Sequence, residues 1–189
     1  MDSSLDDFLD RLAARTPAPG GGGAAAVTGA MAAGLVAMAA RFSVAQLPGA
    51  LDLAEQADRL RYQVTQLVDM DARVYAAVLE ARREGGDLRM ALHGAATVPL
   101  EIAGIGARVA QLAAQVAEAG NPNLRGDAVT GAVLAAASAR SAACLVDINV
   151  ASGGLEPWLS QRAAQAVAEA SDAAERTYTL STERADPEP

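Results

Sequence analysis

AAAVTGAMAAGLVAMAA, residues 24 to 40, decides the fold class, because this run is free of charge and consists mainly of alanine with other small or aliphatic residues. Alanine has the highest helix propensity, and small side chains let neighbouring helices approach closely. The run is shorter than the roughly 20 strongly apolar residues that cross a bilayer. It therefore predicts a helix buried in the core of a helical protein rather than a membrane span.

The rest of the chain agrees with an all-α fold. Aromatic residues make up 3% of the 189 residues, and strand-like runs of β-branched residues are almost absent. The length corresponds to one domain with enough chain for a sizeable core. We expect a single-domain bundle of about six helices over residues 1–184, followed by a frayed tail at 185–189.

The expected helices follow from capping residues and breakers. The stretch TPAPGGGG, residues 16–23, is expected to be irregular because it contains two prolines and four glycines. GNPN at 120–123 is a stop-and-restart signal. The expected ranges are 4–15 (capped by Ser3 or Ser4), 24–44, 52–84, 88–118 or 119 (capped by Asp87), 124–150 and 156–182.

Charge and cysteine content limit the partners and the compartment. The formal net charge is −8 and no basic cluster is longer than Arg82-Arg83, so nucleic acid and anionic membrane are poor partners. Cys144 is the single cysteine, which excludes an intramolecular disulfide and suits the reducing cytoplasm. We expect Cys144 to be a small core residue. The acidic N-terminus is unlike a signal peptide, which also favours the cytoplasm.

The stretch LVDMDARVY, residues 67–75, contains two aspartates inside the expected helix 52–84. At about 100° per residue, Asp69 and Asp71 point about 160° apart, so they cannot chelate one metal or share one proton. Asp71 lies within an apolar stripe, whereas Asp69 faces outward and can pair with Arg73. The stripe consists of Leu53, Ala57, Leu60, Val64, Leu67, Val74 and Val78.

Asp71 has two interpretations that the residues alone leave open. It is either a buried acid neutralised by an arginine from another helix, or a carboxylate held in a cleft of low dielectric with an altered pKa and a catalytic task. Arg140 is a candidate for the neutralising arginine. Arg140 is equally a candidate clamp for a substrate carboxylate.

Two further features are candidates for binding. The glycine-rich stretch PAPGGGGAAA, residues 17–26, can present backbone N–H groups to an anion at a helix start, or can simply let two helices pack closely. Asn123 and Asp127 either cap a helix or belong to a site. His93 is the only histidine, which excludes a site of several histidines.

Several blocks of the sequence resemble the cyclodeaminase/cyclohydrolase family. The blocks are TPAPGGGGAAAVTGAMAAGLVAM, LVDMDARVYAAV, AATVPLEIA, GNPNLRGDA and ARSAACLVDIN, and they occur in the family's order over most of the chain. The family includes the C-terminal domain of formiminotransferase-cyclodeaminase and stand-alone methenyltetrahydrofolate cyclohydrolases. The four-glycine loop and Arg140-Ser141 are more similar to the stand-alone enzymes.

The resemblance implies a dimeric all-α enzyme that hydrolyses 5,10-methenyltetrahydrofolate to 10-formyltetrahydrofolate, with Asp71 as the catalytic residue. It implies no metal and no cofactor beyond the tetrahydrofolate substrate. The alternatives are release of ammonia from 5-formiminotetrahydrofolate, or a divergent, non-catalytic helical dimer, since FSVAQLPGALDL (42–53) lacks the family's usual basic residues. The residues expected to bind substrate are Pro19, Gly20, Gly21, Gly22, Gly23, Asn121, Asn123, Asp127 and Arg140.

Overall fold

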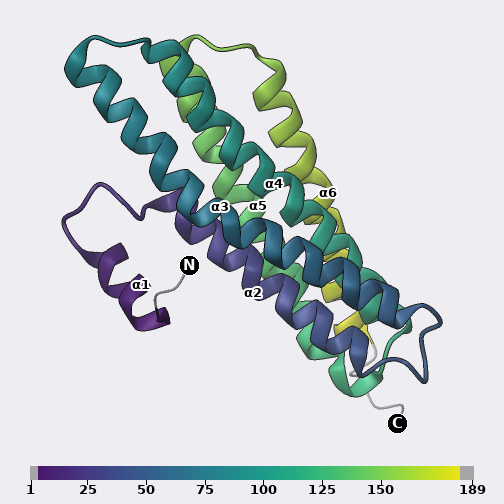
Figure 1. The fold of residues 1–189 in the computed structure, drawn as a ribbon. Helices are drawn as coiled ribbons and strands as arrows, with labels where there is room; N and C mark the ends of the chain where they lie inside the picture. The colour runs from purple at the N-terminus through teal and green to yellow at the C-terminus, as the bar shows by residue number, and fades with distance from the viewer. Residues whose placement is uncertain (1–3, 184–189) are drawn as a thin grey trace.

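The computed structural model describes residues 4–183, and this part of the chain is built from α-helices without strands (Figure 1). The all-α prediction is therefore confirmed, while the predicted frayed tail at 185–189 lies outside the described residues. The helices are α1 (Leu5–Ala13), α2 (Gly21–Arg41), α3 (Ala50–Glu84), α4 (Leu88–Ala119), α5 (Arg125–Gly153) and α6 (Trp158–Glu183), with a 3-10 turn, η1 (Pro122–Leu124), before α5.

The helices α4 and α5 occupy the centre of the bundle. Helix α4 packs against α2, α3, α5 and α6, and α5 packs against α2, α4 and α6. Helix α1 lies apart from the long helices, at the N-terminal end of α2 (Figure 1). It is anchored there by Phe8, which is only 3% exposed. This arrangement places the start of α2 beside the middle of α3.

Small side chains bring the central helices close together. A Cβ atom on Gly106 of α4 would lie 2.9 Å from the Ala135 carbonyl oxygen and 3.1 Å from the Ala139 Cβ of α5, which leaves room only for glycine. The Ser138 hydroxyl of α5 donates to the Ala25 carbonyl of α2 at 2.7 Å. These contacts fix the positions of α2 and α4 relative to α5.

The charge-free run 24–40 is confirmed as a core helix, since Ala26, Ala32, Ala33 and Val36 are fully buried. By length and composition alone, α2 and the segment Pro122–Gly153 would be long and apolar enough to cross a membrane. Within the bundle, 56% of the apolar 18-residue stretch of α2 is buried, and 44% of the corresponding stretch in Pro122–Gly153. Their small residues make the helix contacts of the core, and part of each helix surface is left uncovered.

Several predicted helix ends are confirmed by their caps. Ser4 caps α1 in a reciprocal capping box with Asp7. The Asp87 side chain accepts a hydrogen bond from the Met90 N–H at 2.9 Å at the start of α4. Helix α3 ends at Glu84 and is capped by Gly85, which has a positive φ of 75°.

Two expectations are wrong. The prediction of irregular chain over 16–23 fails at its end, because α2 begins at Gly21 and its first turn is made of glycines. Cys144 is exposed rather than part of the core. Alanines occupy nearly every face of α5, so the sequence pattern does not show which face of this helix is buried.

Candidate active site

Asp71 of α3 faces the N-terminal turn of α2. The Gly23 N–H donates to Asp71 Oδ2 at 3.1 Å, across 48 positions of the chain. The first N–H groups of a helix have no partner within the helix, and its dipole favours negative charge at this end. Asp71 therefore satisfies one of the free donors of α2 with a charged acceptor.

Gly22 makes this approach possible. A Cβ atom at this position would lie 2.0 Å from Asp71 Oδ1 and 2.3 Å from its Cγ, so any side chain would occupy the place of the carboxylate. Gly21 differs, since a Cβ there would meet only the Leu145 methyl groups at 3.7 Å. Glycine is thus required at position 22 because the Asp71 carboxylate packs directly on the backbone of this turn.

Burial raises the pKa of the Asp71 carboxyl above its ordinary value, and the Gly23 N–H only partly offsets this effect. Within residues 4–183, Asp71 has no ion-pair partner. Arg140 instead donates to the Ser171 hydroxyl at 3.5 Å. Neutralisation by Arg140 is therefore not observed, and the structure favours a carboxylate that is available to a ligand.

A cavity of about 300 Å³ opens beside Asp71. It lies between the loop before α2 and the helices α3, α4 and α5. Its walls are mainly apolar, with a carboxylate, an amide and a phenol as the polar side chains. The lining residues are Pro17, Ala18, Gly20, Gly21, Gly22, Asp71, Val74, Tyr75, Ala95, Leu145, Ile148 and Asn149.

Sequence reasoning missed two polar residues of this cavity, Tyr75 and Asn149. Tyr75 is four positions after Asp71 and hence on the same face of α3, a spacing that was available as a signal. Asn149 is the last residue of the block ARSAACLVDIN. No spacing in the chain relates Asn149 to Asp71, because the two residues lie on different helices.

The structure brings only part of the predicted binding set to the cavity. Gly20, Gly21 and Gly22 line it, and Gly23 contacts Asp71. Pro19 is buried in the loop before α2 and does not line the cavity. Its Cβ lies 3.4 Å from the position of a Cβ on Gly23. It follows a cis peptide bond with Ala18.

The other predicted binding residues lie elsewhere. The Asn121 side chain donates to the Phe42 carbonyl at 3.1 Å and accepts from the Asn123 N–H at 3.0 Å, so both residues lie at the C-terminal end of α2. Asp127 is in the first turn of the adjoining α5. Since α2 has 21 residues, this end is about 30 Å from Gly21. The side chain of Asn121 caps the 3-10 turn η1, whereas α5 has Leu124 as its N-cap and no side-chain cap hydrogen bond. The predicted substrate contacts of Asn121, Asn123 and Asp127 stay predictions.

Arg140 also lies outside the cavity. It lines a separate open groove between α5 and α6 with Ser171 and Tyr178. Its predicted role as a clamp for a substrate carboxylate stays a prediction. No group of three or more histidine, cysteine or acidic side chains within residues 4–183 is placed to hold a metal ion.

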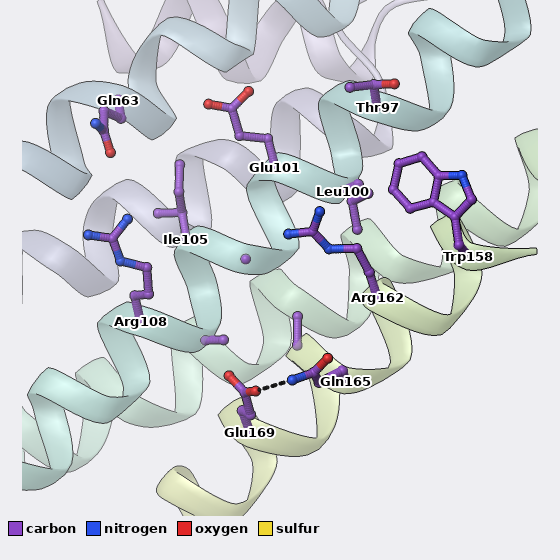
Figure 2. A pocket seen from close by; sticks show the side chains of 13 residues that line it. Gln63, Thr97, Leu100, Glu101, Ile105, Arg108, Trp158, Arg162, Gln165 and Glu169 are labelled. Carbon is purple, nitrogen blue, oxygen red and sulfur yellow. Dashed lines mark hydrogen bonds between the residues drawn. The ribbon is translucent and has the colours of Figure 1, made fainter.

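A larger hollow of about 600 Å³ lies on the outer face of α4, between α3 and α6 (Figure 2). Figure 2 shows Arg108 and Glu101 of α4 with Arg162 and Trp158 of α6 around it, and all four side chains are exposed. Acidic and basic side chains are mixed here, and they are in contact with water. This hollow lacks the partly buried, unpaired carboxylate that makes the Asp71 cavity the better candidate for chemistry.

Comparisons with known proteins show which proteins this chain is similar to. The family model described as formiminotransferase-cyclodeaminase matches residues 4–169. A methenyltetrahydrofolate cyclohydrolase of Methylorubrum extorquens is 34% identical over 163 residues, which cover 77% of this chain and 78% of that protein. A formimidoyltransferase-cyclodeaminase of Mus musculus is 30% identical over 173 residues, which cover 82% of this chain and 28% of that protein.

A solved structure has the same fold. Formiminotetrahydrofolate cyclodeaminase from Thermotoga maritima superposes with a TM-score of 0.86 at 27% sequence identity. The match covers 95% of this chain and 96% of that chain. The arrangement of helices is thus shared over nearly the whole length of both chains.

Substitution of Gly22 should expel the carboxylate from the cavity. We expect Gly22→Ala to turn Asp71 toward solvent, so that its pKa falls back toward the ordinary value of 3.8. NMR titration of carboxyl carbons measures this change. Gly21→Ala is the matched control, because its added Cβ makes only ordinary contacts. An unchanged Asp71 pKa in Gly22→Ala would contradict the geometry.

Replacement of Asp71 by asparagine tests whether the carboxylate serves stability. A folded-state pKa raised above the unfolded one means that ionisation of Asp71 costs stability at neutral pH, and that this cost disappears as the pH falls below both values. Asp71→Asn keeps an acceptor for the Gly23 N–H without the charge. At pH 7 we expect the free energy of unfolding of Asp71→Asn to equal or exceed that of the wild type. As the pH falls toward 4, the free energy of unfolding of the wild type should rise relative to that of the variant.

Urea unfolding at pH 7 and pH 4 measures the free energy of unfolding of the wild type and of Asp71→Asn. If the charge of Asp71 instead stabilised the start of α2, its removal in Asp71→Asn would lower the free energy of unfolding by about 0.3–1 kcal/mol at pH 7. A loss of that size would overturn the conclusion that the charged form of Asp71 is held against a stability cost.

Proposed function

The chain belongs to the formiminotransferase-cyclodeaminase family, and on that premise we propose that it hydrolyses 5,10-methenyltetrahydrofolate to 10-formyltetrahydrofolate. The observation that carries this proposal is the partly buried carboxylate of Asp71, which lines a cavity and has no cationic partner within residues 4–183. The activity matches the name of the relative that is 34% identical.

The charge of the substrate fits this cavity. The bridging carbon of methenyltetrahydrofolate lies between two nitrogens of a cationic amidinium and is already electrophilic. An ionised carboxylate beside it is attractive to the cation, and the attraction is strong in a partly dry site. The reaction needs no cofactor beyond the tetrahydrofolate substrate itself.

Asp71 would act as a general base. Its carboxylate takes one proton from a water molecule while the water oxygen forms a bond to the bridging carbon, which gives a neutral carbinol. The bond from this carbon to N5 then breaks, N5 receives the proton from Asp71, and the carbinol hydroxyl loses its own proton as the formyl C=O forms. One proton is released in total. The raised pKa of Asp71 makes it a stronger base than an ordinary aspartate.

The second candidate reaction is release of ammonia from 5-formiminotetrahydrofolate, which closes the same methenyl bridge. It is favoured by the structural match to a formiminotetrahydrofolate cyclodeaminase. There the same side chain would supply a proton to the leaving nitrogen. Both reactions place a carboxyl group beside the same carbon, so the cavity alone does not separate them.

Near-ultraviolet absorbance of the methenyl bridge distinguishes these reactions. Purified protein should accelerate loss of the bridge, and Asp71→Asn should lower the rate by about 10²- to 10⁴-fold, as expected for removal of a general base. Appearance of the bridge from the formimino compound, without accelerated loss, would support the deaminase. If neither compound is turned over and calorimetry shows no folate binding, both reactions are excluded and a non-catalytic helical protein is left.

The functional unit that we propose is a homodimer in the cytoplasm. Helix α2 has no charged residue before Arg41, yet Met31 is 48% exposed and Val27 and Leu35 are only partly covered. An apolar helix face of this kind is typical of a protein interface. Asn121 and the Asp71 cavity of one chain lie at opposite ends of α2. In a dimer, the Asn121 of one copy could instead approach the Asp71 cavity of the other.

Sedimentation analysis tests the dimer. The wild-type chain should sediment at twice its monomer mass of 19.2 kDa, whereas Met31→Glu should sediment as a monomer because it places a charge in the apolar contact. Met90→Glu is the control, since Met90 is 71% exposed on α4, away from α2. A monomeric wild type, or an unaffected Met31→Glu variant, would contradict the α2 interface.

A further inference from the structure

Asn149 of α5 lines the Asp71 cavity with its side-chain amide in a fixed orientation. Its Nδ2 group donates to the Ala95 carbonyl of α4 and to the Leu145 carbonyl of α5, both at 2.9 Å. Carbonyl oxygens only accept hydrogen bonds, so the nitrogen must face them. Both hydrogens of the amide are thereby used, and Oδ1 must point away from these carbonyls.

The Oδ1 atom of Asn149 is open to a ligand. It has no hydrogen-bond partner among residues 4–183. The side chain is only partly buried, and the described part of the chain contains no buried side-chain nitrogen or oxygen without a partner. Oδ1 is therefore accessible, and the amide presents an acceptor at the wall of the cavity.

The polar side chains of the cavity are dominated by acceptors. Asp71 presents a carboxylate and Asn149 an amide oxygen, while Tyr75 adds a hydroxyl that can act either way. Such a lining favours a ligand that brings cationic charge and N–H donors. In methenyltetrahydrofolate the cation is the bridge, and the donors of the flat ring system are the amino group and ring N–H groups of the pterin.

We propose that Asn149 is a specificity residue whose Oδ1 accepts a hydrogen bond from the 2-amino edge of the pterin ring while Asp71 faces the bridge. This inference rests on the proposed function. It assigns recognition of the pterin edge to Asn149, whereas the predicted substrate-binding residues Asn123 and Asp127 lie near the other end of α2.

The same residue also ties α5 to α4 through its nitrogen, and a purely structural role has to be separated from recognition. The two roles use different atoms of one amide. Loss of the nitrogen loosens the contact between α5 and α4 and should lower kcat/KM for every ligand alike. Loss of the oxygen should lower kcat/KM only for ligands that carry the donor. A comparison of two ligands on one variant therefore distinguishes them.

The test compares kcat/KM for 5,10-methenyltetrahydrofolate and for its analogue with hydrogen in place of the 2-amino group. The wild type should prefer the amino compound by roughly ten- to a hundredfold, the range expected when a desolvated acceptor is left unpaired. Asn149→Ala should reduce this preference to less than about threefold. Asn149→Asp loses the hydrogen bonds to the Ala95 and Leu145 carbonyls but keeps oxygen acceptors at the cavity wall, so it should lower kcat/KM for both compounds and retain the preference.

Thermal unfolding shows which variants are folded. If Asn149→Ala does not fold, Asn149→Ser replaces it, because a serine hydroxyl can still donate to the Leu145 carbonyl four residues earlier but does not reach the ligand. An unchanged preference in Asn149→Ala or Asn149→Ser, or a wild type without preference, overturns the inference while the proposed function stands. A wild type that neither binds nor converts the amino compound overturns the proposed function and this inference with it.

Discussion

The contact between the Asp71 carboxylate and the first turn of α2 is the constraint on which the site depends. It requires a helix that begins without side chains, because a Cβ on Gly22 would occupy the position of the carboxylate oxygens. It also requires α3 to pass directly beside that helix end, where the Gly23 N–H meets Asp71. Close packing of small residues supplies this second condition, since a Cβ on Gly29 of α2 would lie 3.4 Å from a methyl group of Val64 of α3.

This contact leaves a carboxylate whose charge is only partly compensated. Burial raises the pKa of Asp71, and one backbone N–H does not cancel the effect. A neighbouring arginine would have removed the cost, but it would also have neutralised the charge that a cationic substrate can use. Under the proposed function, this carboxylate would serve both as a base and as an attractive charge for a cationic bridge. Such a conflict between stability and availability of a charge is expected at a catalytic centre.

The family comparisons and the geometry support each other at different levels. The cyclodeaminase from Thermotoga maritima shares the arrangement of helices over nearly the whole chain, and the cyclohydrolase relative supplies the expected reaction. The geometry shows which of the predicted residues lie at the cavity. It keeps Gly20 to Gly23 with Asp71, it places Asn121 and Asn123 in a cap at the far end of α2, and it adds Tyr75 and Asn149 to the cavity.

The sequence by itself determined the all-α class, most helix ends and the position of Asp71 on the covered face of α3, because helical periodicity and capping are local properties of the chain. It did not show that the glycines 21–23 are helical, since glycine-rich sequence is typical of irregular chain and the Asp71 carboxylate that contacts this turn is 48 positions away. Nor did it show the exposure of Cys144 or the position of Asn149 at the cavity, because α5 has alanines of its own on nearly every face. Only tertiary packing selects the face that such a helix buries, and that selection brings Asn149 to the cavity of Asp71.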